Sequence, residues 1–284
     1  MEPLPGQAPL RLSAPAKLNL CLYLGPRRED GLHELCSLFE PLALADLISV
    51  DEAERDEVVC AGVEGENLAA RALAALRERG WDHPPLRVEI EKRIPVAAGL
   101  GGGSADAAAV LRLAAGGVVD LKEIALGLGA DVPSQLNPSL ALVEGVGERV
   151  ERLPPPAPHA VVLLPDGGGL STAAVFAEAD RLDLGRPADE LDELAGRLRA
   201  SAGAGASPLS YPELLVNDLE PAARSLRPDI GEALDALRAA GAPQALLTGS
   251  GPTAFGLFPD LAAAGTAAAE LDRDDAIVCE AGAT

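Results

Sequence analysis

A glycine-rich segment between a strand pattern and a helix pattern constrains this chain more than any other feature. Residues 86–91 alternate apolar with charged side chains, which predicts a half-buried strand, and residues 105–113, rich in alanine and leucine, predict a helix. The connection carries glycine at positions 99, 101, 102 and 103. Without Cβ atoms, its backbone N–H groups can turn toward one point beside the positive end of the helix dipole. The segment therefore predicts an anion cradle, most naturally for phosphate.

Two common phosphate-binding loops do not match this segment. A Walker A loop ends in Gly-Lys-Ser or Gly-Lys-Thr, whereas here Ser104 follows Gly103 directly, with no lysine between them. A dinucleotide-binding loop would have a third glycine in place of Ser104 and an acidic residue on a second strand about 20 residues later. The remaining alternative is a turn that binds nothing, although so much glycine ahead of a helix is a costly way to make a turn.

The charge balance limits which partners the chain can have. Its net charge of −21 repels nucleic acids and anionic membrane surfaces, so neither is expected as a partner. Lysine occurs only at positions 17, 92 and 122. An acidic protein that binds phosphate must concentrate positive potential locally, and Lys17 and Lys92 lie in or beside segments that other observations single out.

Length and hydropathy indicate a globular protein. A chain of 284 residues, of which 48% are hydrophobic, suits one large or two modest domains with a substantial core. No apolar run approaches the roughly 20 residues of a membrane span, and the acidic, proline-rich beginning is not typical of a signal peptide, so a cytoplasmic location is expected. The cysteines have neither metal-binding nor paired spacing and are expected to be reduced core residues: Cys21, Cys36, Cys60 and Cys279.

Residues 11–24 predict a second strand. Leucine occupies positions 18, 20, 22 and 24, and this alternation places the leucines in the core. The opposite face carries Lys17 and Asn19. From this strand alone, a solvated sheet face is the simpler interpretation of that pair, and a binding site is the alternative.

Two further polar residues have both a structural and a functional interpretation. Asn67 stands directly before a helical pattern at 68–79 and is a natural N-cap, a role at least as plausible as ligand binding. His33 follows a polar turn at 25–31, where a lone histidine is most often a surface residue. Another strand is expected over 46–50.

The rest of the chain predicts further helices and strands around a proline-rich linker at 154–158. A helix is expected from Leu121, and Pro133, two residues after Asp131, is expected to stop any helix. The remaining predictions are a hairpin at 141–150, a strand at 160–164, a helix carrying Thr172 and Phe176, a mobile loop at 201–207, helices within 213–240, strands at 245–247 and 254–258, a helix from 261 and a strand at 276–279. This order suggests an α+β fold, with sheet packed against helices.

Three separated segments together resemble the motifs of the GHMP small-molecule kinases. They are Pro15-Ala16-Lys17-Leu18-Asn19-Leu20, the glycine loop within 95–108, and Leu247-Thr248-Gly249-Ser250-Gly251. Segments 30–35, 129–133 and 144–148 are similar to one branch of that family, whose substrate is a cytidine diphosphate derivative of methylerythritol. The likeness runs from about residue 12 to 258, which is nearly all of the chain.

The resemblance implies a two-domain α+β fold of the GHMP kinase type. An N-terminal, nucleotide-binding β/α domain would occupy residues 1–153, and a C-terminal, α/β sandwich-like domain would occupy 159–284. The active site would lie in the cleft between them. The implied activity is ATP-dependent phosphorylation of the 2-hydroxyl of the cytidyl substrate, in the non-mevalonate route to isoprenoid precursors.

The same resemblance implies roles at the matching positions. Asp131 would accept or orient the proton of the substrate hydroxyl, while Lys17 would neutralise charge between that carboxylate, the hydroxyl and the γ-phosphoryl group. Such positioning and charge stabilisation are what phosphoryl transfer chiefly needs. The Ser104 hydroxyl would reach Mg²⁺ held by ATP. The residues expected around ATP are Asn67, Lys92, Pro95, Gly99, Gly101, Gly102, Gly103 and Ser104.

A second group of residues would bind the cytidyl substrate. Asn19 would position the erythritol, His33 would hydrogen-bond cytosine, and Phe176 would stack on the base. Thr172 would lie near the diphosphate, and Leu32, where the family commonly has an aromatic residue, would cover the base with apolar surface.

Two other functions remain open from the sequence. A GHMP kinase for another small alcohol, such as homoserine or mevalonate, would have no use for the segment around His33. A nucleotide-binding regulator without catalysis would need no carboxylate at Asp131.

Overall fold

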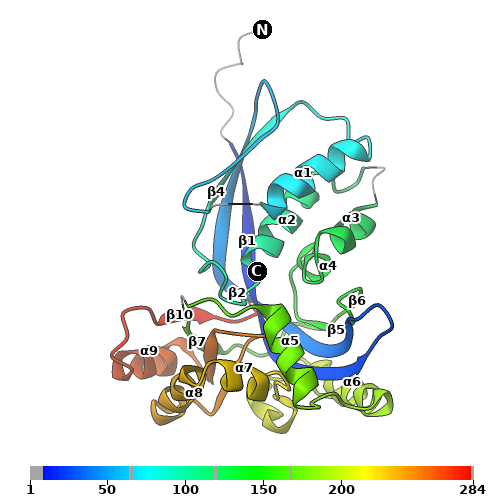
Figure 1. Ribbon diagram of the computed structural model, residues 1–284. Helices are drawn as coiled ribbons and strands as arrows, with labels where there is room; N and C mark the ends of the chain where they lie inside the picture. Colours follow the sequence, from blue (N-terminus) through cyan, green and yellow to red (C-terminus); the bar gives the residue numbers. More distant parts are fainter. Residues whose placement is uncertain (1–8, 64, 66, 118–119, 167, 283–284) are drawn as a thin grey trace.

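The computed structural model describes residues 9–63, 65, 67–117, 120–166 and 168–282. Met1 and Glu2, on which the expectation of no signal peptide rests, lie outside them. Two long antiparallel strands, β1 (Leu10–Arg27) and β2 (His33–Glu52), run from the top of the molecule into its lower half (Figure 1). Both strands run through the upper and the lower lobe and so connect them.

Strand β1 confirms the predicted strand and its leucine face, since Leu18, Leu20 and Leu24 are almost completely buried. Strand β2 is much longer than the strand expected over 46–50. The pairing of β1 with β2 shifts register between Pro15 and Lys17, close to Pro41, where missing backbone N–H groups would leave gaps in a regular ladder. Such bulges let two long strands bend and serve both lobes.

The first sheet has the strand order β3-β4-β2-β5-β6, with β1 paired to β2; helices of the upper lobe pack against it, and its β5–β6 end lies in the lower half of the molecule (Figure 1). Strand β4 alternates buried and exposed residues, as predicted for 86–91. The hairpin, the helix that follows its N-cap Asn67 and the helix from Leu121 are also confirmed. The elements are β3 (Glu57–Cys60), α1 (Leu68–Glu78), β4 (Leu86–Glu91), α2 (Gly102–Arg112), α3 (Leu121–Leu128), α4 (Val132–Gln135), β5 (Ala141–Gly145) and β6 (Arg149–Arg152).

The lower lobe contains a second, antiparallel sheet of order β10-β7-β9-β8, covered by helices (Figure 1). Its strands confirm those predicted. Its elements are β7 (Ala160–Leu164), α5 (Thr172–Arg181), α6 (Ala188–Ala202), the 3₁₀ turns Pro208–Ser210 and Pro212–Leu214, α7 (Glu220–Leu226), α8 (Asp229–Ala239), β8 (Gln244–Leu247), β9 (Ala254–Phe258), α9 (Leu261–Glu270) and β10 (Ile277–Glu280).

Two sequence expectations are wrong in detail. Pro133 does not stop a helix, because it lies in the first turn of α4, where the missing N–H group has no helical partner to lose. The loop expected at 201–207 begins later, since residues 201 and 202 complete α6. That helix was not predicted, and it buries Leu194, Leu198 and Ala202 along one face.

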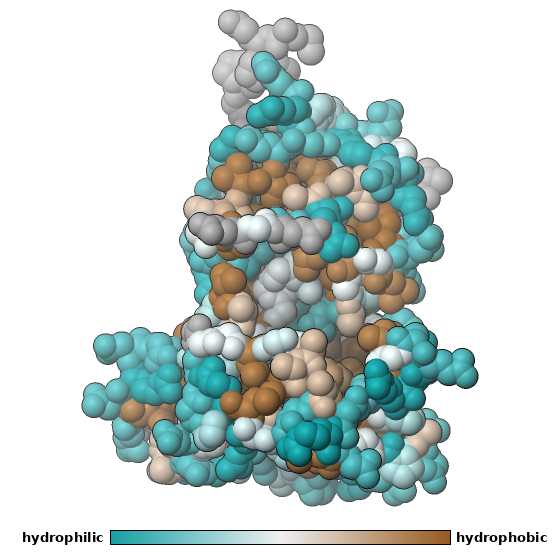
Figure 2. Space-filling model, in the orientation of Figure 1, coloured by the Kyte–Doolittle hydropathy of each residue, from teal (hydrophilic) through white to brown (hydrophobic). Residues whose placement is uncertain are grey.

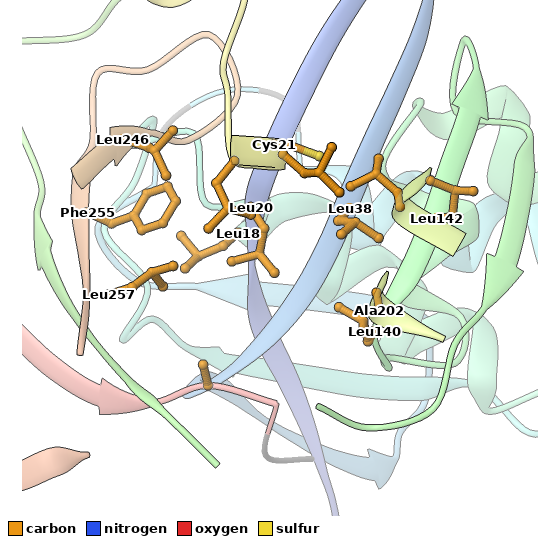
Figure 3. Close-up of a cluster of buried hydrophobic side chains, with 14 of the residues drawn as sticks. Leu18, Leu20, Cys21, Leu38, Leu140, Leu142, Ala202, Leu246, Phe255 and Leu257 are labelled. Carbon is orange, nitrogen blue, oxygen red and sulfur yellow. The ribbon is translucent and has the colours of Figure 1, made fainter. Parts of the chain in front are cut away.

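A shared core joins the two lobes (Figure 3). Leu18 and Leu20 of β1 lie against Phe255 and other residues of the lower sheet, while Leu38 and Leu142 extend the same cluster on the other side. The linker predicted at 154–158 does fall between the last strand of one sheet and the first of the other. The boundaries 1–153 and 159–284 remain a prediction, because residues from both sides of the linker build this core.

The cysteines and the surface agree with a compact globular fold. Cys21 and Cys36 are buried, Cys60 and Cys279 are partly buried, and all are free thiols. Hydrophilic residues cover most of the outer margin of the face in Figure 2, with apolar residues gathered nearer its middle. In the described part of the chain, no helix combines the length and apolarity needed to cross a membrane.

Candidate active site

The glycine loop forms the wall of a cavity of about 310 Å³. Helix α2 starts at Gly102, earlier than the expected residue 105, because Gly101 caps it in a left-handed conformation with φ of 70°. The N–H groups of Gly102, Gly103 and Ser104 therefore belong to the first helical turn and have no partner within the helix. Together with the helix dipole they make this wall attractive to an anion.

The cavity brings together every residue predicted to contact ATP. Asn67 and Leu68, at the start of α1, also line it. Its lining is Cys60, Val63, Asn67, Leu68, Lys92, Pro95, Val96, Ala97, Ala98, Gly99, Leu100, Gly101, Gly102, Gly103, Ser104 and Asp106. Asn67 is also the predicted N-cap, because its Oδ1 accepts a hydrogen bond from the backbone N–H of Ala69 at 2.8 Å. Its structural role and a place at the cavity are thus compatible.

Lys17 and Asp131 come together beside this loop. The Nζ atom of Lys17 lies 3.5 Å from Oδ2 of Asp131 and donates a hydrogen bond to Oδ1 of Asn19 at 2.6 Å. The Lys17 side chain is only 7% exposed, whereas that of Asp131 is 30% exposed. The solvated-face interpretation of Lys17 and Asn19 is therefore wrong. Both faces of β1 are buried here, since Leu18 and Leu20 belong to the shared core while Lys17 and Asn19 belong to this polar cluster.

The third motif, 247–251, completes the cluster. The backbone N–H of Asn19 donates to Oγ1 of Thr248 at 3.0 Å. A Cβ on Gly99 would lie 2.8 Å from the carbonyl oxygen of Gly251, so glycine at 99 is required by this close approach. Asn217 holds the motif in place, since its amide donates to the carbonyl oxygens of Leu247 and Gly249. No sequence pattern pointed to Asn217.

Lys92 has two carboxylate partners that the sequence did not reveal. Its Nζ contacts Asp46 and lies 2.9 Å from Oδ2 of Asp106. Burial disfavours the charged lysine, but the hydrogen bonds to the two carboxylates outweigh it and raise the pKa of Lys92. Burial also raises the pKa of Asp106 to about 6, although Lys92 opposes that shift. The three groups form a buried charge cluster, of which Lys92 and Asp106 line the cavity.

This cluster predicts an unusual pH dependence of stability. Between the ordinary pKa of 3.8 and about 6, the folded protein holds a proton on Asp106 that the unfolded chain has released. The Asp106 contribution should therefore fall as pH rises, by about 1–2 kcal/mol between pH 5 and pH 7.5. Asp106→Asn should remove this fall in the free energy of unfolding between the two pH values, as measured by denaturant unfolding at each. Asp235→Asn, at an exposed site, is the control. Equal slopes for Asp106→Asn and wild type would contradict the prediction.

The predicted substrate residues gather along α5. Oγ of Ser250, in the third motif, lies 2.9 Å from Oγ1 of Thr172 at the start of the helix. One turn further on, the ring of Phe176 lies 5.5 Å from that of His33, measured between centroids. His33 is buried, so the expectation of a surface histidine is wrong. Leu32, at the β1–β2 turn, is 52% exposed and leaves apolar surface open to a ligand.

The described residues contain no group of three or more histidine, cysteine or acidic side chains suited to a metal ion. Ser104 nevertheless fits the magnesium role expected of it. Its hydroxyl lines the cavity and makes no hydrogen bond to any other described residue. Such a hard oxygen donor would suit Mg²⁺ carried by a phosphate ligand, because the ion typically takes only one or two protein carboxylates and completes its shell with water and phosphate.

Family models of known proteins match segments in both halves of the chain. Residues 67–133 match the model of the GHMP kinase N-terminal domain, and residues 177–276 match that of the GHMP kinase C-terminal domain. The chain belongs to the GHMP kinase family. The two-domain α+β fold expected from the resemblance is confirmed, and membership of a kinase family implies use of ATP.

Two of the similar proteins are named as kinases of the same compound. A 4-diphosphocytidyl-2-C-methyl-D-erythritol kinase of Anaeromyxobacter sp. strain Fw109-5 is 41% identical over 93% of this chain and 87% of its own length. A crystal structure of 4-(cytidine 5'-diphospho)-2C-methyl-D-erythritol kinase matches 97% of this GHMP kinase and all of that chain, with a TM-score of 0.80 and 36% identity. A homoserine kinase from Cytophaga hutchinsonii has a TM-score of 0.72 over 100% of this chain and 97% of its own, but its 18% identity shows only the common fold.

Proposed function

We propose that this GHMP kinase transfers the γ-phosphoryl group of ATP to the 2-hydroxyl of 4-diphosphocytidyl-2-C-methyl-D-erythritol, giving the 2-phosphate and ADP. The reaction belongs to the methylerythritol phosphate route to isoprenoid precursors. The observation that carries the proposal is the Lys17–Asp131 pair, 3.5 Å apart, in a site that also contains the glycine loop. The names of the relatives at 36–41% identity support the choice of substrate.

In this proposal Asp131 accepts or orients the proton of the attacking hydroxyl. Its carboxylate is partly exposed and within reach of a ligand, whereas Lys17 is buried beside it. As the hydroxyl oxygen approaches the phosphorus, negative charge gathers between Asp131 and the phosphoryl oxygens. The Lys17 ammonium, fixed by Asn19, offsets that charge without needing to reorganise.

The nucleotide lies in the glycine-loop cavity. The first-turn amides of α2 bind phosphate oxygens, and Asn67 and Lys92 line the part of the cavity expected to take adenine and ribose. The Ser104 hydroxyl, together with ATP, would hold Mg²⁺, and the bound ion would supply charge neutralisation at the phosphate oxygens. The charge of Lys92 is already balanced by Asp46 and Asp106, so its contribution is to shape and polarity more than to net charge.

The cytidyl substrate extends from Asn19 along α5. Thr172 lies near the diphosphate, and Phe176 and His33 receive the cytosine, which Leu32 covers from the open side. A kinase for homoserine or mevalonate would share Lys17 and Asp131 but would gain nothing from this base-binding end. A non-catalytic regulator would need neither of the paired charges.

ADP release with a panel of alcohols tests the proposal. We expect turnover with the cytidyl substrate in the presence of ATP and Mg²⁺, and at least about 100-fold lower kcat/KM with homoserine and mevalonate, which bury no base. The reverse order would assign the chain to another GHMP kinase, and binding of ATP without turnover of any alcohol would favour the regulator. The cytoplasmic location and the absence of nucleic-acid partners expected from the sequence remain predictions.

A further inference from the structure

One face of helix α5 connects the phosphoryl-transfer cluster to His33. Thr172, Phe176 and Asp180 are spaced four residues apart, so their side chains follow one another along that face. Thr172 contacts Ser250 of the third motif, and Phe176 packs against the His33 ring. Asp180 then makes a hydrogen bond with the same ring. No role for Asp180 follows from the sequence motifs, although it lies at the end of the proposed substrate site.

The contact between His33 and Asp180 determines which ring nitrogen carries the proton. Nε2 of His33 lies 2.8 Å from Oδ1 of Asp180. An ionised carboxylate can only accept hydrogen bonds, so Nε2 must be the donor. In the neutral imidazole, Nδ1 is then an acceptor. No described residue makes a hydrogen bond to Nδ1, so it remains available to a ligand.

Asp180 has a second charged neighbour, which helps to orient its carboxylate. Nη1 of Arg27, at the end of β1, lies 3.8 Å from its Oδ2. The Asp180 side chain is 38% exposed, whereas the His33 side chain is 6% exposed. A half-exposed carboxylate thus fixes the tautomer of a buried ring.

We propose that Asp180 is a positioning residue that gives the site its preference for cytosine over uracil. This inference rests on the proposed function, in which His33 reads the base. With Nε2–H bound to Asp180, Nδ1 of His33 accepts a hydrogen bond from the exocyclic amino group of cytosine. Uracil has a carbonyl oxygen at the same position, and two acceptors facing each other leave both unpaired. Stacking on Phe176 tolerates either base, so the hydrogen bond carries the discrimination.

Asp180→Asn tests this inference with little change of shape. An asparagine amide can accept from Nε2–H or, after rotation, donate to Nε2, and the second arrangement moves the ring proton to Nδ1. We expect wild type to bind cytidine diphosphate at least about 10-fold more tightly than uridine diphosphate, and Asp180→Asn to reduce that ratio at least about fivefold. Titration calorimetry, with an unhydrolysable ATP analogue filling the glycine-loop cavity, measures both ratios. Asp180→Glu, which keeps an acceptor-only group, should restore the preference.

Two further measurements separate positioning from a general structural effect. Nitrogen-15 spectra of the three histidines should show His33 protonated at Nε2 in wild type and partly at Nδ1 in Asp180→Asn. Asp183→Asn, just beyond α5 and without a side-chain hydrogen bond to described residues, should change neither the spectrum nor the binding ratio.

An unchanged binding ratio in Asp180→Asn, or a His33 proton on Nδ1 in wild type, would overturn the inference. Failure of the kinase proposal would be visible separately, as absence of ADP release with the cytidyl substrate. Because the binding ratio and the spectra need no turnover, they test Asp180 whatever the outcome of that assay.

Discussion

Asp131→Asn is expected to lower kcat by about 10²- to 10⁴-fold, the range for loss of a positioned general base. The amide keeps the size of the side chain but cannot take up the hydroxyl proton, and it leaves Lys17 without its carboxylate partner. ATP affinity should change little, because Asp131 is not among the residues that line the glycine-loop cavity. The loss should therefore appear in kcat and kcat/KM together.

Steady-state kinetics with the cytidyl substrate, alongside ATP binding by calorimetry, checks this expectation. Asp235→Asn is a matched control, since that carboxylate lies on α8 and is 72% exposed. Lys17→Ala should act in the same direction as Asp131→Asn. An unaltered kcat in Asp131→Asn would show that this residue only shapes the turn before α4.

Gly103→Val is expected to weaken ATP binding by about 100-fold or more, which corresponds to about 2.7 kcal/mol. Beyond its own helix backbone and chain neighbours, a Cβ at this position would meet, among the described residues, only Cδ1 of Leu68, at an ordinary contact distance of 3.6 Å, so the substitution has room there. Because Gly103 lines the glycine-loop cavity, the branched side chain would take up space beside the first-turn amides of α2. A loss of ATP affinity in this variant would then indicate that the phosphates of ATP bind at this position.

Neighbouring glycines make less selective tests. Gly101 has φ of 70° and its Cβ would lie 2.9 Å from Cγ of Lys17, so substitution there would strain the backbone and displace a proposed catalytic group. At Gly102 a Cβ would press on Ile94 and Lys92, both at 3.1 Å.

Gly127→Val is the control for Gly103→Val, because Gly127 also lies in a helix and, outside that helix's own backbone and its chain neighbours, no described atom lies within 4 Å of its added Cβ. Calorimetric titration with ATP and Mg²⁺ compares the two variants, and thermal unfolding confirms that both fold. Normal ATP affinity in Gly103→Val would remove the phosphate cradle from the proposed site.

Local sequence patterns determined most of the secondary structure. The two-residue alternation in β1 and β4, and the capping residue before α1, are signals carried by neighbouring residues, so they were readable without a structure. The glycine loop was likewise recognisable, because a lack of Cβ atoms before a helix limits what the backbone can do there.

Where the extent of a helix or strand depends on segments far away in the sequence, local sequence patterns did not predict it. Strand β2 continues well beyond 46–50 because β1, β4 and β5 pair with different parts of it. Helix α6 was missed although its buried residues follow helical spacing. Helix α4 was excluded by the presence of Pro133, since the sequence alone does not show that the proline would fall in a first turn.

The sequence determined which residues form the motifs, and only the tertiary structure decided what they face. Alternation in β1 placed Lys17 and Asn19 opposite the leucines but was equally compatible with solvent. Asn19 meets Thr248 across 229 residues, and His33 meets Asp180 across 147. Such contacts arise when two lobes pack around a shared core. They depend on the combined geometry of many elements, and no local sequence pattern encodes them.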